Sequence, residues 1–467
     1  MSISASQGLR IEFVIVGAGI AGLACAYSLR VAGHDVRVLE AQEEVNLGKG
    51  PAGIRIPPNM SRILSRWDLG PEFIKTLGGV CREVLFHSGY TGEFIGEILF
   101  HKEVMKVMEA EFFLMHHGDL ILALYNLAVD AGVRFDFGAK VKSVNLSDPC
   151  AILSTGEEIF GDVIIGADGD RSMVRQTLQS GVNEDKDSTY SVSTFSLSAS
   201  QFNDDEELME LTKYSLWNIW MGTGWAVFVF PVRKGSELSV MFYKEEREPT
   251  ESKGWEHTVS AEKLNFGEFD FEPKIKRLMS LASEVVQSRC IEQSPIENWF
   301  DKEGHVVVVG QAAHYINTAG NHVAAMGMED AVILGGLFSR LKSRNQIKAL
   351  LSAYQELRES RYEAVQASEA DKLDVVTLPP GPKRDARDAT MRKEREVGIL
   401  ELAKSPDEYL RTSLEEFRVF GYDAFDEVDT WWVEWGVLLE RMHGTHENNR
   451  VNGFGDQVIV ESHSNVQ

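Results

Sequence analysis

The sequence predicts an α/β protein in which a parallel-sheet domain is interrupted by an antiparallel sheet and followed by helices. Three observations predict this fold class. The apolar run Ile11–Val16 precedes a glycine-rich turn, a helix and a second apolar run, which is the order of a strand–helix–strand unit. Further apolar strands are expected at 162–167 and 305–309, where the chain returns to the parallel sheet. Residues 188–243 carry alternating, aromatic-rich runs that are typical of antiparallel strands.

The first unit has the glycine pattern of a dinucleotide-binding turn. Gly17, Gly19 and Gly22 form G-x-G-x-x-G between the first strand and a helix expected over Ala21–Ala32. The first glycine permits a tight turn, the second lets the backbone approach a pyrophosphate, and the third lets the helix pack closely on the strand. The N-terminus of the helix directs its amides and the positive end of its dipole toward the phosphates.

Glu40 ends the second strand, about twenty residues after the glycines, where a carboxylate can accept both hydroxyls of an adenosine ribose. An acid at this place favours FAD or NAD over NADP. The alternative is a glycine turn in an α/β unit that binds nothing. Strand, turn, helix, strand and acid occur here in order, which favours binding of a dinucleotide.

Length and composition limit the function classes. A chain of 467 residues exceeds the usual single domain, so two interleaved domains are expected. The net charge of −24 argues against nucleic acid and anionic membranes as partners. The polar start MSISASQGLR and the absence of a long apolar segment predict a cytoplasmic protein with no stable membrane insertion. Four scattered cysteines predict buried thiols and no metal site.

The remaining elements follow from local patterns. A glycine-rich connection over 48–56 leads into a helix that begins with two prolines. Helices are expected at 116–132, from about Ser172, over the charged segment 244–285, and at 323–341 and 349–367. Short strands are expected at 133–137, 139–146, 151–154 and 158–160. These elements divide the chain into a nucleotide-binding domain (1–185 and 299–372), a substrate domain formed by the sheet insertion (186–298), a C-terminal helical region (373–442) and a polar tail expected to be disordered (443–467).

Two later stretches carry chemical groups. In GADGDRSMVR, Asp168 and Gly169 end a strand, where the aspartate can contact a cofactor or cap the next helix. The stretch Gly310–Ala331 follows a strand and opens a helix whose amides face negative charge, which in a flavoprotein can stabilise an anionic reduced ring. His314 and His322 are acid–base candidates within it, although hydrogen-bonded loop histidines are more common. Glu329 and Asp330 are expected to pack beneath the loop.

Aromatic residues crowd the expected antiparallel sheet. Most of them must form a packed core, and those on the cofactor side would line an apolar pocket for a flat substrate. The pattern does not tell which face this is. The residues are Trp217, Trp220, Trp225, Phe228, Phe230 and Phe242.

Together, GAGIAGLACAYSLRVAGHDVRVLE, GADGDRSMVR and the G-x-A-A-H loop with its downstream E-D-A resemble the single-component FAD-dependent aromatic hydroxylases. GPAGIRIPPNMSRILSRWDLG, FPVRKG, LPPGPKRDARDATMR and FGYDAFDEVDTWW resemble the fungal salicylate-hydroxylase-like subgroup, and the likeness covers about residues 10–440. The resemblance implies a Rossmann-like FAD-binding domain of the glutathione-reductase type with an inserted antiparallel sheet and C-terminal helices.

The resemblance also implies a reaction. NADH or NADPH, bound transiently without a dedicated Rossmann domain, reduces FAD, and O₂ is then activated to attack a small aromatic substrate. In salicylate-type members hydroxylation is coupled to decarboxylation.

Cofactor contacts carry over position by position. Gly17, Gly19, Gly22 and Glu40 match the adenosine–pyrophosphate site, Ala52 and Gly53 the loop near the ribityl chain, Asp168 and Gly169 a dual flavin and nicotinamide contact, and Ala324 and Ala325 the amides beneath the isoalloxazine.

The sequence departs from the family around the flavin ring. The usual cofactor-contacting arginine is replaced by His117, which is shorter and only partly charged, and the ribityl-binding aspartate by Gln311. Tyr315 and Thr318 replace two prolines, and residues 321–323 (NHV) replace A-Q-G. The first inserted strand lacks the arginine that many members carry. Each lost charge-assisted contact costs about 1–3 kcal/mol of FAD binding.

Two functional hypotheses remain open at this level. The first is an active monooxygenase that hydroxylates a hydrophobic phenolic or aromatic acid in secondary metabolism. Its base would be His314, His322 or Tyr315, named by loop position alone. The second is a relative that has left redox chemistry, keeps at most a structural FAD, and catalyses a cyclisation-type step or acts as a binding protein.

Overall fold

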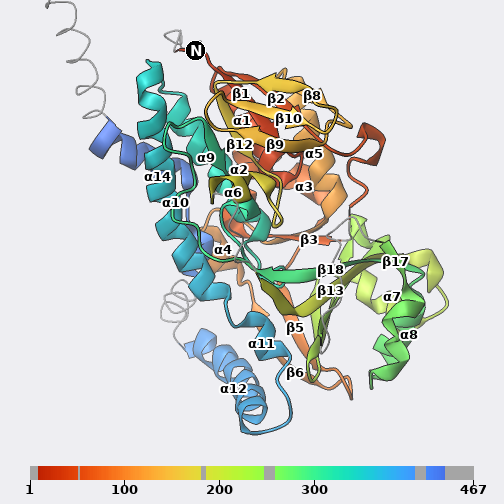
Figure 1. Ribbon diagram of the computed structural model, residues 1–467. Helices are drawn as coiled ribbons and strands as arrows, with labels where there is room; N and C mark the ends of the chain where they lie inside the picture. Colours follow the sequence, from red (N-terminus) through yellow and green to blue (C-terminus); the bar gives the residue numbers. More distant parts are fainter. Residues whose placement is uncertain (1–8, 51–52, 180–185, 247–257, 405–416, 437–467) are drawn as a thin grey trace, which may run out of the picture.

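The computed structural model describes residues 9–50, 53–179, 186–246, 258–404 and 417–436. Ala52 and the tail 443–467 therefore lie outside the described residues. In Figure 1 the nucleotide-binding half lies at the top and a large sheet lies below it.

A five-stranded sheet forms the centre of the upper half. All four of its strand pairs are parallel, which confirms the predicted unit and the return of the chain from distant segments. Its strands, in spatial order, are β19 (Val306–Val308), β12 (Val163–Gly166), β1 (Glu12–Val16), β2 (Asp35–Leu39) and β8 (Arg134–Asp136). A small antiparallel sheet lies beside it, formed by β9 (Val141–Asn145), β10 (Cys150–Leu153) and β11 (Glu158–Phe160).

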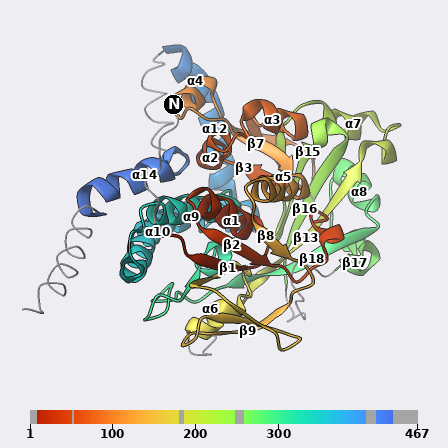
Figure 2. The same ribbon diagram turned by 90° about the horizontal axis from the view of Figure 1, so that it is seen from above.

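Helices cover the parallel sheet. The helix after the glycine turn, α1 (Ile20–Val31), packs between α9 (Val323–Phe338) and α5 (His117–Asp130), as Figure 2 shows from above. Outside them, α10 (Ile347–Glu369) packs on α9. Burial is nearly complete on α9 because this apolar helix is covered on several sides.

The lower half is a sheet of eight strands. It is antiparallel except for one parallel pair, β14 with β5. In spatial order its strands are β17 (Thr258–Ser260), β18 (Glu284–Glu292), β13 (Lys186–Ser198), β16 (Glu237–Glu245), β15 (Trp225–Val232), β14 (Trp217–Met221), β5 (Glu83–Ser88) and β6 (Phe94–Leu99). The last two strands come from the first part of the chain, so the sheet extends beyond the insertion at 186–298.

The two faces of this sheet sort the aromatic residues. Trp217, Phe228 and Phe230 point to the inner face, toward the upper half. Trp220, Trp225 and Phe242 point to the outer face, beneath the small helices α7 (Glu206–Lys213) and α8 (Pro273–Ser280). All six are buried, which confirms that most of these residues are core.

A three-stranded sheet joins the halves. It contains β3 (Gly53–Ile56), β7 (Phe113–His116) and β4 (Gly79–Val80), and Figure 1 places β3 between the upper and lower sheets. Three short helices complete this part: α2 (Pro58–Arg66), α3 (Pro71–Leu77) and α4 (Lys102–Val107). A fourth, α6 (Met173–Leu178), packs on β9 and β12 in the upper half. Farther along the chain, α11 (Lys372–Val376), α12 (Pro382–Lys404) and α14 (Ala424–Trp431) form the helical C-terminal region.

Two expectations about local structure were wrong. The segment 244–285, expected to be helical, holds β17 and the start of β18 as well as α8. The expected sheet region is also interrupted by α7. All four cysteines are buried free thiols, as predicted.

A buried ionic cluster ties the helices together. The fully buried guanidinium of Arg358 on α10 donates from Nη1 to Glu329 and from Nε to Asp330, each at 2.7 Å. Asn59 on α2 donates to Glu329 at 2.7 Å, and Arg361 adds a second cation at 2.9 Å. Three side chains thus position two adjacent carboxylates of α9, and the two arginines among them balance the carboxylate charges.

Burial alone would raise the pKa values of these carboxyl groups. For Glu329 the charges of Arg361 and Arg358 outweigh burial and lower the pKa to about 2. For Asp330 the charges of His314 and Arg358 do the same, and its pKa is also about 2. Both groups are therefore ionised in the folded protein at neutral pH.

Replacing Arg358 with methionine should strongly destabilise the fold. The change leaves two carboxylates in the core with less compensation, and breaking a buried pair costs about 3–5 kcal/mol. Denaturant unfolding of the purified variant measures the loss. The exposed pair Lys75–Glu72 supplies the control, because Lys75→Met should cost less than about 1 kcal/mol. Equal losses in both variants would contradict the importance of the cluster.

Acid should weaken the fold through the same carboxylates. A folded-state pKa of about 2 for Glu329 lies below the unfolded value of about 4.3. Its contribution is therefore complete above pH 4.3 and falls as pH drops toward 2. Unfolding measured across this interval should show a smaller pH dependence for Glu329→Gln than for the wild type. Identical pH dependences would contradict the assignment.

Candidate functional site

A cavity of about 910 Å³ runs between the two halves of the molecule. At one end it is lined by the glycine turn after β1, and in the middle by the loop before β3 and the start of α5. At the other end it reaches the inner face of the large sheet, where Arg55, Met241 and Tyr243 line it. This volume is in the range of pockets that bury small molecules and cofactors.

The three glycines of the turn have the predicted geometries. Gly17 adopts φ +103°, and a Cβ there would lie 2.7 Å from the carbonyl oxygen of Ala167. A Cβ on Gly22 would lie 2.0 Å from the carbonyl oxygen of Gly17, so only glycine allows α1 to pack this closely. Gly19 has nothing within 4 Å of a Cβ and borders the cavity, so its backbone is open to a ligand.

Glu40 follows β2 and lines the same end of the cavity. Its Oε2 accepts from the amide of Ala18 at 2.7 Å, and its Oε1 accepts from the amide of Gln42 at 2.8 Å. These two bonds fix the carboxylate at the cavity wall. Each oxygen keeps a further acceptor site, so the group can still receive ribose hydroxyls.

Asp168 borders the cavity but is hydrogen-bonded within its own turn. Its carboxylate accepts from the amides of Met173 at 2.8 Å and Val174 at 3.2 Å, and from the hydroxyl of Ser172. Burial raises the pKa of this carboxyl, while the three donors lower it. The side chain of Asp168 therefore caps the start of α6, which was one of its two expected roles. Gly169, with φ +81°, lines the cavity beside it.

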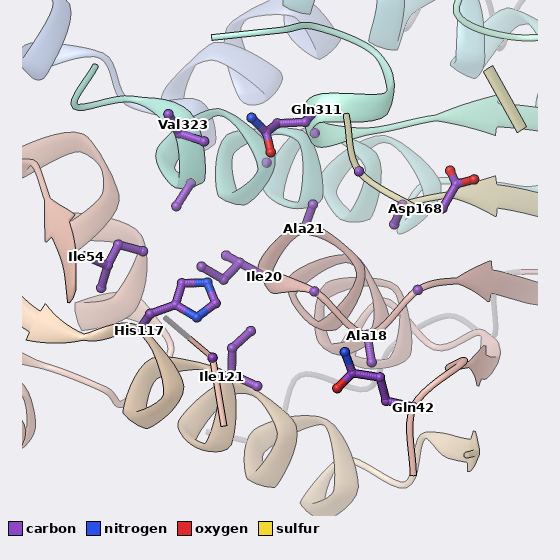
Figure 3. A pocket seen from close by; sticks show the side chains of 18 of the residues that line it. Ala18, Ile20, Ala21, Gln42, Ile54, His117, Ile121, Asp168, Gln311 and Val323 are labelled. Carbon is purple, nitrogen blue, oxygen red and sulfur yellow. The ribbon is translucent and has the colours of Figure 1, made fainter. Parts of the chain in front are cut away.

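The two altered positions face each other across the cavity. Figure 3 shows His117 projecting from the start of α5, with Gln311 entering from the opposite wall. Burial, with a smaller effect of His116, lowers the pKa of His117 to about 4. The side chain is therefore neutral at pH 7, which corrects the expectation of a partial charge. Its Nδ1 and the Nε2 of Gln311 are buried without a hydrogen-bond partner.

The remaining cofactor positions divide between the cavity and the core. Gly53 and Ala324 line the cavity, and Ala324 lies in the first turn of α9, whose N-terminus therefore borders it. Ala325 is fully buried in the core behind this wall.

These features fit FAD. The open Gly19 backbone and Glu40 suit the adenosine and pyrophosphate half. The unpaired nitrogens of His117 and Gln311 suit polar atoms of the ribityl chain or the ring, since buried polar atoms need partners.

None of the three acid–base candidates lines the cavity. His314 is buried and its Nε2 lies 2.7 Å from Asp330 Oδ2, inside the ionic cluster. His322 is fully buried, its Nδ1 lies 2.6 Å from Glu369 Oε1, and burial lowers its pKa below the ordinary value. The hydroxyl of Tyr315 is buried near Cys290, and burial raises the pKa of this phenol. The loop turns these side chains toward the protein interior.

Two cavity residues were missed by sequence reasoning. Arg55 lies on β3 and Tyr243 on β16, and both donate to the loop after β19. The available signal was a lone charge in the otherwise apolar strand GIRI, which is unusual for a buried strand.

Comparison with known families identifies the chain. Residues 103–368, more than half of the sequence, match the family described as "FAD binding domain". Residues 15–48 match the "NAD(P)-binding Rossmann-like domain", which covers the glycine turn. The chain belongs to the FAD-binding family.

Relatives that match over most of their length are also flavin-dependent monooxygenases or hydroxylases by name. The chain is 25% identical over 425 residues to the FAD-dependent monooxygenase OpS4 of Beauveria bassiana, covering 90% of this chain and 97% of that protein. It is 26% identical to hispidin-3-hydroxylase of Neonothopanus nambi, covering 79% and 90%. Among solved structures, that of CtdE in complex with FAD and a substrate superposes with a TM-score of 0.75 at 16% identity, covering 92% of this chain and all of that one.

The protein is an FAD-dependent monooxygenase of the aromatic-hydroxylase family, and FAD is its cofactor. The predicted recognition and fold class are thereby confirmed. In the described part of the chain, no helix is long and apolar enough to cross a membrane.

Substitution of Gly19 and of Gly22 should separate the effect on FAD binding from the effect on the stability of the fold. Gly19→Ala should weaken FAD binding at least tenfold, roughly the effect of 1.4 kcal/mol, because a methyl would enter the open space a pyrophosphate needs. The stability of the protein without FAD should be unchanged. Gly22→Ala should reduce both FAD affinity and stability, because its methyl group would clash with the carbonyl oxygen of Gly17. FAD titration by absorbance and thermal unfolding give the two readouts, and wild-type FAD affinity in Gly19→Ala would refute the assignment.

Proposed function

We propose that this monooxygenase hydroxylates a small aromatic or phenolic compound, with or without loss of a carboxyl group, using NADH or NADPH and O₂. The observation that carries the proposal is the continuity of the cavity. It joins the glycine turn to the inner face of the large sheet, so a substrate can lie beside the reactive end of the cofactor. The names of two relatives, OpS4 and hispidin-3-hydroxylase, support oxygen transfer of this kind.

The sheet end of the cavity suits a flat ring. Val192, Thr194, Met241 and Val286 line it, and aromatic side chains back it from the inner face. Apolar walls of this kind exclude water and favour stacking of an aromatic substrate. FAD, when bound, supplies electron transfer and activation of O₂. The chain's own residues orient the ring and hold the loop at Thr318 through the Tyr243 hydroxyl at 2.9 Å.

We infer that NADH or NADPH binds this protein only transiently. Two runs match G-x-G-x-x-G, and only Gly17–Gly22 joins a strand to a helix, because the run at 48–53 leads into β3. We assign the turn at Gly17–Gly22 to the adenosine half of FAD. A single dinucleotide site supports delivery of electrons by a co-substrate that binds briefly. Membership of the monooxygenase family favours this redox hypothesis over the non-redox alternative, although His117 and Gln311 remain uncharged replacements at the flavin.

The decisive experiment follows isotopic oxygen. FAD-loaded protein is given NADH or NADPH under ¹⁸O₂ with a panel of phenols and aryl carboxylates. We expect at least one compound to stimulate NAD(P)H oxidation and to gain one ¹⁸O atom, detected by mass spectrometry. Catalase in a parallel reaction separates true hydroxylation from hydrogen peroxide release. Product formation without O₂ and NAD(P)H would overturn the proposal and support the non-redox alternative.

A further inference from the structure

A buried cation without an anionic partner lies at the sheet end of the cavity. Arg55 lines the cavity and only 6% of its surface is exposed. Among the described residues, no carboxylate lies within salt-bridge distance of it. The contrast with Arg358 is direct, because that buried guanidinium is held by two carboxylates.

The neighbours of Arg55 satisfy only part of its guanidinium. Its Nη2 donates to the carbonyl oxygens of Thr318 at 2.7 Å and Gly320 at 2.8 Å. Its Nη1 contacts the sulfur of Met241 at 3.5 Å, and its Nε has no partner. A guanidinium offers five N–H groups, and only the two on Nη2 are matched to oxygen acceptors here. Nη1 meets only a weak sulfur acceptor, and Nε meets none.

Aromatic rings add to this setting. The guanidinium carbon lies 5.0 Å from the ring centre of Trp217 and 5.9 Å from that of Phe228. Ring faces and carbonyl oxygens stabilise a cation but carry no net charge. Burying an uncompensated charge is costly, so a site of this kind is completed by an anion.

The other cationic side chains of the described cavity lining differ from Arg55 in place or exposure. Lys140 follows Ala139, whose amide binds the Glu40 backbone, and therefore belongs to the adenosine end. Lys49 lies in the loop before β3, and His117 is neutral. The first inserted strand supplies Val192 and Thr194 to the cavity and no arginine. Among the described residues that line the cavity, Arg55 is the one buried cation, since Lys49 is exposed.

We propose that Arg55 binds the oxyanion of an anionic aromatic substrate, either a carboxylate or a phenolate. The inference rests on the proposed function, because it names the substrate class of that same site. An arginine can pair with such an oxyanion through two parallel N–H groups, which fixes the orientation of the ring as well as adding affinity. Arg55 is a specificity residue in this account, since it positions the substrate and takes no part in oxygen transfer.

The test measures binding to the oxidised, FAD-loaded protein without NAD(P)H, so it does not depend on hydroxylation. The carboxylate arm compares 2-hydroxybenzoate with its neutral counterpart 2-hydroxybenzamide. The phenolate arm compares 4-nitrophenol, at a pH above its pKa, with 4-nitroanisole. Isothermal titration calorimetry gives each Kd. The wild type should prefer the anion in at least one arm by roughly 10- to 100-fold, the effect of one charge-assisted pair.

Variants decide whether Arg55 is responsible. Arg55→Gln should abolish the preference for the anion while leaving binding of the neutral compound within a few fold. Arg55→Lys keeps the charge without the fork and should retain part of the preference. Lys140→Gln removes an equal charge at the far end of the cavity and should keep the preference. Because Arg55 also holds the loop at Thr318 and Gly320, FAD content and thermal unfolding are checked for each variant.

Each result supports or overturns the proposal. Loss of the preference in Arg55→Gln but not in Lys140→Gln supports it, and the arm concerned identifies the oxyanion. Wild-type preference in Arg55→Gln, or equal loss in both variants, overturns it. If Arg55→Gln does not hold FAD, the wild type and Arg55→Lys decide, and the absence of a preference in both arms of the wild type overturns it. Failure of ¹⁸O incorporation with an intact anion preference would instead reject the proposed function alone.

Discussion

The geometry of the cofactor site depends on charges that never touch it. Glu329 and Asp330 are adjacent on α9, and Arg358 holds both from the neighbouring helix. Asp330 also accepts from the amide of Gly310 at 2.7 Å, which fixes the loop after β19. Because the first turn of α9 borders the cavity, the ionic cluster sets where its amides and dipole point. Buried charges that are paired in this way favour one arrangement of the helices over others.

The same constraint explains why a histidine in this loop is a poor base. His314 serves the cluster through Asp330, and His322 serves a second clamp through Glu369 at the end of α10. A side chain that fixes the loop in the core cannot also reach a substrate. The chemistry therefore belongs to the cofactor, and the protein contributes apolar walls, a helix N-terminus and one buried guanidinium.

The sequence predicted what is local and missed what is distant. The roles of Gly17, Gly22 and Glu40 follow from spacing within one strand–helix–strand unit, and the capping of α6 by Asp168 lies within six residues. By contrast, β5 pairs in parallel with β14, far along the chain, and nothing in its alternation names that partner. Arg55 is held by carbonyl groups that lie 263 and 265 residues away in the sequence. No local pattern could therefore reveal its surroundings.

Charge is distributed unevenly along the cavity. The acidic residues among its described lining, Glu40 and Asp168, both lie at the adenosine end and both accept hydrogen bonds from backbone amides. At the other end, Arg55 and the N-terminus of α9 both favour negative charge, and neutral His117 offsets neither. The whole chain carries a net charge of −24, so its exterior repels anions while this end of the cavity attracts them. An anionic substrate would thus gain its binding energy inside the site, in contacts that also orient its ring.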